Sequence, residues 1–86
     1  MYRVDIREDA AKAIERLPRK MGEAIYKSIA ALADNPRPHG CKKLKFPVPL
    51  YRIRVAEYRI VYTIEDKRLV VLVIRVAHRR EVYRQL

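Results

Sequence analysis

Two kinds of hydrophobic spacing occupy the first third of the chain. Residues 2–6 alternate apolar and polar side chains, which predicts a short strand whose apolar face carries Tyr2, Val4 and Ile6. From Asp9 the apolar residues recur every three or four positions, which predicts a helix that Pro18 ends or kinks. A second apolar stripe with helical spacing comprises Met21, Ile25, Ile29 and Leu32. It stops at Asp34-Asn35-Pro36, so the two helices are expected to form a hairpin.

Strand patterns dominate from residue 50 onward. Residues 35–49 contain four prolines and a glycine, which favours a long loop, although residues 41–46 fit a short edge strand that exposes Lys42, Lys43 and Lys45. Three runs of strand character follow, at 50–55, 58–64 and 69–76. The third is apolar throughout 69–74, which predicts a central strand covered on both faces. Residues 79–86 fit a short terminal helix.

The order of these elements predicts one α+β domain over residues 1–86. Its N-terminal strand and helical hairpin are expected on one face of a mostly antiparallel sheet, in the order β-α-α-β-β-β with a short C-terminal helix possible. A chain of 86 residues is too short for two independent cores.

The hairpin at residues 50–64 separates charged from apolar side chains. If Ala56-Glu57 is a two-residue turn, Val55 pairs with Tyr58 and Arg54 pairs with Arg59. One face then carries Tyr51, Ile53, Val55, Tyr58, Ile60, Tyr62 and Ile64, and it is suited to receive the helices. The other face carries Arg52, Arg54 and Arg59.

Clustered arginines on one face work against stability by several tenths of a kcal/mol, because like charges opposite each other on a sheet repel. A solvated, aggregation-resistant strand surface is one explanation. The other is an anion site, since the arginine fork binds phosphate oxygens with two donors and keeps its charge.

The charge of the whole chain is consistent with either explanation. Twenty basic residues against ten acidic ones give a net charge of +10, and 13 of the basic but only four of the acidic residues lie in 35–86. This indicates a polyanionic partner or a basic solvated surface. Cys41 is the single cysteine, so an intrachain disulfide and a CxxC zinc site are excluded, and a cytoplasmic setting is expected. No apolar run is long enough to cross a membrane.

The stretch LYRIRVAEYRIVYTIEDKRLVVLVIRVAHRREVY, residues 50–83, resembles the sheet of the RelE/ParE superfamily, the toxins of type II toxin-antitoxin modules. The shared features are a hairpin of the Y-[RK]-I-[RK] then Y-R-[LIV]-[LIV]-Y type and an ending of the [GA]-[HK]-R then V-Y type. The helical hairpin that closes in NP and the following KKLK segment extend the resemblance to nearly the whole chain.

The resemblance to the RelE branch of this superfamily implies an activity for this chain. RelE-type toxins cleave messenger RNA in the ribosomal A site without a metal or other cofactor, through attack of a ribose 2′-OH on the adjacent phosphate. The positions that match the family's functional residues are Arg52, Arg54, Arg59, Arg79 and Tyr83. The chain departs from the family in having arginine for lysine at the first two, which removes groups that readily lose a proton. His78 is therefore a further candidate for proton transfer, or else an imidazole with no task.

Two hypotheses from different classes follow from the resemblance. In the first, Arg59 and Arg79 stabilise the phosphorane, with Arg54, Tyr83 and His78 as the other catalytic candidates. Flanking RNA would then be bound by Arg52, Arg54, Lys42, Lys43, Lys45 and Arg80. In the second, the chain is a ParE-like toxin that inhibits DNA gyrase through protein binding. Either toxin implies a cognate RelB-like antitoxin in a hetero-oligomer, and the first adds the ribosome and messenger RNA as partners.

Overall fold

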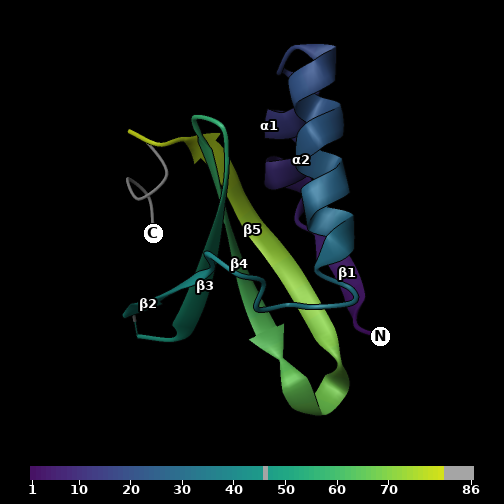
Figure 1. Cartoon of the computed structure of the whole chain (residues 1–86), viewed down its shortest axis with the longest axis vertical. Coiled ribbons are helices and arrows are strands. Elements are labelled where there is room, and N and C mark those ends of the chain that lie inside the picture. Colours follow the sequence, from purple (N-terminus) through teal and green to yellow (C-terminus); the bar gives the residue numbers. More distant parts are fainter. Residues whose placement is uncertain (46, 81–86) are drawn as a thin grey trace.

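The computed structural model describes residues 1–45 and 47–80 as two helices and five strands (Figure 1). Their bounds are β1 Arg3–Ile6, α1 Glu8–Glu15, α2 Arg19–Ala31, β2 Lys42–Lys45, β3 Pro49–Val55, β4 Tyr58–Glu65, the short 3₁₀ helix η1 Asp66–Arg68, and β5 Val70–His78. No helix in this part of the chain is long and apolar enough to cross a membrane. The predicted C-terminal helix lies mostly outside the described residues, and Arg79 and Arg80 form a turn.

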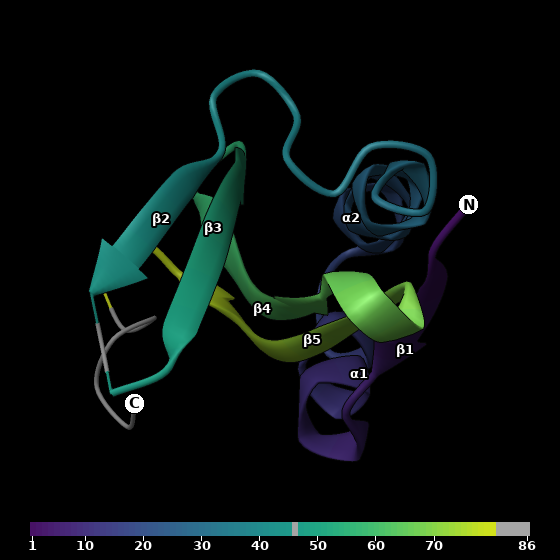
Figure 2. The ribbon, with the colours of Figure 1, turned by 90° about the horizontal axis from the view of Figure 1, so that it is seen from below.

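The strands form one mixed sheet in the order β1-β5-β4-β3-β2. β1 lies in the sheet as an edge strand parallel to β5, and the other neighbours are antiparallel. Both helices cover the same face of the sheet (Figure 1). The loop after α2 crosses from the helices to β2, as Figure 2 shows from below. This is the predicted α+β architecture, including the short edge strand at residues 42–45.

The hydrophobic core lies between the helices and this face. The helices contribute Ala10, Ile14, Ile25 and Ile29, and Leu32 follows directly after α2; all five are at most 2% exposed. The sheet contributes the buried residues Ile53, Ile60, Tyr62, Val71, Val73 and Val76. The predicted hairpin register is confirmed, with Val55 opposite Tyr58 and Arg54 opposite Arg59. The assignment of the apolar hairpin face to the helices is therefore correct.

β5 departs from the prediction that both of its faces are covered. Val71, Val73 and Val76 are buried against the helices, whereas Val70 and Leu72 on the other side of the strand are only half-buried. The register between β4 and β5 also shifts between Val61 and Tyr62. Tyr62 is opposite Val73 but Val61 is opposite Arg75, so Ile74 is an extra residue in β5, which is a β-bulge.

Hydrogen bonds fasten the loop after α2 to the rest of the fold. The Arg37 guanidinium donates to both oxygens of Asp66, at 3.2 and 2.9 Å, and lies 5.1 Å from the centre of the Tyr51 ring. The Tyr2 hydroxyl donates to Asp66 at 2.6 Å. These donors lower the pKa of the Asp66 carboxyl to about 2, with Arg37 the larger cause. In the same loop, the Pro36 carbonyl accepts a hydrogen bond from the buried Tyr62 hydroxyl at 2.7 Å.

Candidate nucleic-acid interface

The β3–β4 hairpin places three arginines on the sheet face that the helices leave open. Arg54 is directly opposite Arg59, and Arg52 is opposite Val61. The two strands are joined at Ala56-Glu57, where Ala56 has a left-handed φ of 53°. This tight turn keeps the strands in register, so strand alternation holds the arginines on one face while Ile53 and Ile60 enter the core.

The β-bulge adds a fourth arginine to the same face. Counting along β5 from Val71 and Val73 by strand alternation puts Arg75 on the helix side, among the buried valines. The extra residue Ile74 reverses this alternation, so Arg75 lies opposite Val61 instead. Arg75 was not predicted as a site residue. The only signal in the sequence was an arginine next to the apolar run 69–74, which does not by itself indicate a bulge.

A small apolar cluster lies among these arginines. Val61 is 0% exposed and Leu50 is 4% exposed. Packed against them are Leu44, Ile74 and Ala77. Arg52 and Arg59 are half-buried beside this cluster, and within the described part of the chain their Nε atoms are buried and have no hydrogen-bond acceptor. A buried donor without an acceptor costs about 1–3 kcal/mol, so a bound anion would stabilise these two side chains.

The hairpin turn binds Arg54 and one further arginine, Arg79, at the end of the face. The backbone N–H of Arg79 donates to the Glu57 carbonyl at 2.8 Å, and Arg79 Nε lies 3.1 Å from Glu57 Oε2. Both side chains of this ion pair are about half exposed, at 47% and 54%, so water screens it. Arg54 Nε donates to the Ala56 carbonyl at 3.1 Å. The two side-chain contacts each engage an Nε atom and orient the guanidinium relative to the turn.

His78 does not share the sheet face of Arg52, Arg54 and Arg59. It is opposite Tyr58, whose side chain packs on the helix-side core, and the two rings meet edge to face with centroids 5.8 Å apart. Its Nδ1 accepts a hydrogen bond from the backbone N–H of Arg80 at 3.3 Å. The bulge causes this placement too, because uninterrupted alternation from Val70 and Leu72 would put His78 on the open face. The other candidate for proton transfer, Tyr83, lies outside the described residues.

The lysines predicted to bind RNA separate by strand register. Lys42 is opposite Arg52 and extends its row across the sheet. Lys43 is opposite Tyr51, which lies on the helix-facing side, so Lys43 does not share the face of the arginines. Lys45 is opposite Pro49 in the register. Arg80 is exposed in the turn after β5.

This arrangement is chemically suited to a phosphate chain. Arg52, Arg54, Arg59 and Arg75 place planar, permanently charged groups on one face of three neighbouring strands. Glu57, the acid of the adjoining turn, is already paired with Arg79. Among the residues described, no group of three or more His, Cys, Asp or Glu is placed to hold a metal ion.

Comparisons with known proteins agree with this geometry. The family model for the ParE toxin of type II toxin-antitoxin system, parDE, matches residues 2–83. The toxin RelE of Mycobacterium tuberculosis is 35% identical over 85 residues, which cover 96% of this chain and 87% of that protein. The archaeal RelE in the RelE-RelB complex from Pyrococcus horikoshii superposes with a TM-score of 0.82 at 28% identity, covering 91% of this chain and 94% of that one. The isolated Escherichia coli RelE toxin superposes with a TM-score of 0.77 at 30% identity, covering 91% of this chain and 84% of that one.

Proposed function

Because this chain belongs to the ParE toxin family of type II toxin-antitoxin systems, within the RelE/ParE superfamily, we propose that it is a ribosome-dependent endoribonuclease that cleaves messenger RNA in the A site. The observation that carries this proposal is the arginine face itself. Arg52 and Arg59 have buried Nε atoms with no acceptor in the described part of the chain, which is an arrangement that an RNA phosphate would satisfy.

The proposed reaction uses the RNA's own nucleophile. The ribose 2′-oxygen attacks the adjacent phosphorus, the bond from phosphorus to the 5′-oxygen breaks, and the products are a 2′,3′-cyclic phosphate and a 5′-hydroxyl. One proton leaves the 2′-OH and one reaches the 5′-oxygen. Arg59 and Arg79 would stabilise the extra negative charge on the phosphorane, while Arg52 and Arg54 would bind flanking phosphates. Of the two candidates for proton transfer we favour Tyr83, because His78 lies on the helix side.

A second function is favoured by one finding, which is that the matching family model is that of ParE. In this alternative the chain inhibits DNA gyrase through protein binding, and its basic face supplies electrostatic complementarity. The alternative gives no role to the paired arrangement of Arg54 and Arg59, whose mutual repulsion has to be offset elsewhere in the fold.

The proposed partner of the free toxin is a cognate RelB-like antitoxin. The Pyrococcus horikoshii relative is a RelE-RelB complex, which supports a toxin-antitoxin hetero-oligomer for this chain. With a net charge of +10, the chain should be neutralised by an antitoxin segment that is acidic where it covers the arginines. The proposed site of action is the cytoplasm, where the ribosomes are.

The deciding experiment is expression of the chain in a translation extract, followed by primer-extension mapping of the messenger RNA. Discrete cuts within translated codons are expected for the wild-type chain, and their loss is expected for Arg59→Ala. A matched control is Arg68→Ala, which removes an exposed arginine from η1 at the far end of the sheet. Intact messenger RNA together with gyrase-dependent DNA breaks would establish the alternative instead.

A further inference from the structure

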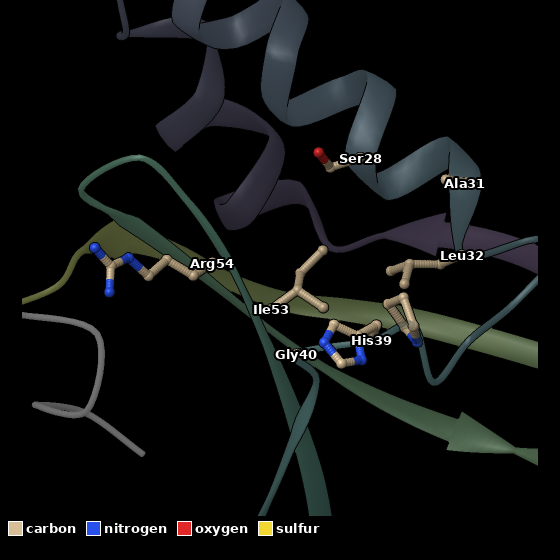
Figure 3. Close-up of a pocket in the computed structure, with 8 residues that line it drawn as sticks. Ser28, Ala31, Leu32, His39, Gly40, Ile53 and Arg54 are labelled. Carbon is tan, nitrogen blue, oxygen red and sulfur yellow. The ribbon is translucent and has the colours of Figure 1, made fainter.

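A hollow of about 430 Å³ lies on the helix side of the sheet edge, between α2, the loop after it and β3, and Arg54 of the arginine face borders it. Its residues are Ser28, Ala31, Leu32, Pro38, His39, Gly40, Ile53 and Arg54. Figure 3 shows Ile53 and Leu32 directed toward one another at the floor of the hollow, with Ser28 above on α2 and His39 on the opposite side. The floor of the hollow is thus aliphatic, and its rim offers a hydroxyl and an imidazole.

The hollow opens at a gap in the sheet edge. In the described register β2 pairs with Pro49 to Arg52 of β3, so the remaining edge of β3, residues 53–55, extends beyond its neighbour. Arg54 is in this segment. Its side chain extends away from the hollow in Figure 3, toward the face that carries Arg59. A chain bound along the arginines can therefore pass this edge with one substituent turned toward the hollow.

We propose that this hollow receives a nucleobase of the RNA strand whose phosphates are bound by the arginine face. The inference rests on the proposed function and adds a base-binding position to it. Three observations support a nucleobase as the occupant. The volume of the hollow falls in the range of small-ligand sites, and its floor is aliphatic with polar groups only at the rim. Arg54 also connects the hollow to the arginine face. Ala31, Pro38 and the accessible part of Ile53 cover the flat face of the nucleobase, and Ser28 and His39 contact its polar edge.

The test compares RNA with a backbone of equal charge that has no bases. The probes are fluorescent decamers of adenosine, uridine and cytidine and an abasic decamer of the same length. The wild-type chain should bind at least one base-containing decamer about tenfold more tightly than the abasic one, the ratio expected for one well-packed base. Base stacking elsewhere on the protein would also raise this ratio, so variants that fill the hollow are needed.

Ala31→Trp and Ser28→Leu each fill the hollow from α2, and Ala24→Trp adds the same bulk at an exposed position of α2 outside it. The ratio of the affinity for a base-containing decamer to that for the abasic decamer should fall toward one in at least one filling variant whose Tm equals that of the wild type. The same ratio should be unchanged in Ala24→Trp. Affinity for the abasic decamer should not change. An unchanged preference in both filling variants overturns the proposal, even if they weaken antitoxin binding, because the occupant would then be a protein.

The outcomes separate this proposal from the one it rests on. Equal binding of all decamers by the wild-type chain overturns the base position alone. Binding of none of them overturns the phosphate-binding face and the base position together. Arg59→Ala should weaken binding to the base-containing and abasic decamers by the same factor, because Arg59 is expected to contact phosphate and not a base.

Discussion

Replacing Arg59 with methionine should stabilise the fold while it weakens RNA binding. Arg59 is directly opposite Arg54, and its buried Nε has no acceptor within the described residues. Methionine keeps an unbranched side chain of similar reach over the neighbouring Val61, but it has neither the charge nor the donor. The free chain therefore loses two unfavourable interactions, whereas bound RNA loses a phosphate ligand.

The size of the effect follows from these two interactions. Relief of a like-charge pair across two strands is worth roughly 0.2–1 kcal/mol, and relief of a buried donor without an acceptor is worth about 1–3 kcal/mol. Repacking around a side chain of different shape costs up to about 1.5 kcal/mol. Because Arg59 is only half-buried, we take the low end for the donor. The net gain is about 1 kcal/mol, or a rise of about 4–8 °C in Tm for a domain of this size.

Thermal unfolding monitored by circular dichroism tests the first half of this prediction, and the salt dependence of RNA binding tests the second. Removal of one phosphate contact should reduce the slope of log K against log salt by about 1. Arg68→Met is the control. Arg68 is 71% exposed and, among the residues that the structure describes, its one ion pair is with Glu65, so the free energy of unfolding should change by less than about 0.5 kcal/mol. A fall of several degrees in the Tm of Arg59→Met would refute the reasoning, because Arg59 would then stabilise the free fold.

Four further substitutions test the core, the turn and the two ends of the sheet. Ile60→Ala should lower the free energy of unfolding by about 2–5 kcal/mol in denaturant titration, because Ile60 is 0% exposed. Arg79→Ala should slow single-turnover cleavage by roughly 10²–10³ and leave Tm nearly unchanged, since its ion pair with Glu57 is half exposed. The depressed pKa of Asp66, about 2, makes its carboxylate stabilising above about pH 4 and less so as the pH falls toward 2. Asp66→Asn should therefore be less stable at neutral pH and lose less stability over that acid range, as acid titration of Tm will show. His78→Gln should leave the pH–rate profile of cleavage unchanged, and a flattened profile would contradict its placement on the helix side.

Local rules were sufficient to predict the hairpin that carries the site. Alternation along residues 50–55 and 58–64, together with a turn of two residues, leaves one register in which all the large apolar side chains share a face. Burying that face against the helices compensates for placing Arg54 opposite Arg59. The arginine face could therefore be predicted from the sequence, because hydrophobic burial is stronger than the cross-strand repulsion it produces.

β5 shows where such rules fail. An apolar run gives no alternation to follow, so the position of a bulge within residues 69–76 is not encoded in the hydrophobic pattern. The bulge is instead favoured by contacts made across the sheet: it allows Val73 and Val76, three residues apart, to face the same helix-side core. The same extra residue moves Arg75 to the open face and His78 away from it. One inserted residue in a strand thus determines which titratable and charged groups lie on the arginine face, where we propose that RNA binds, and this depends on tertiary packing that the sequence pattern of β5 does not reveal.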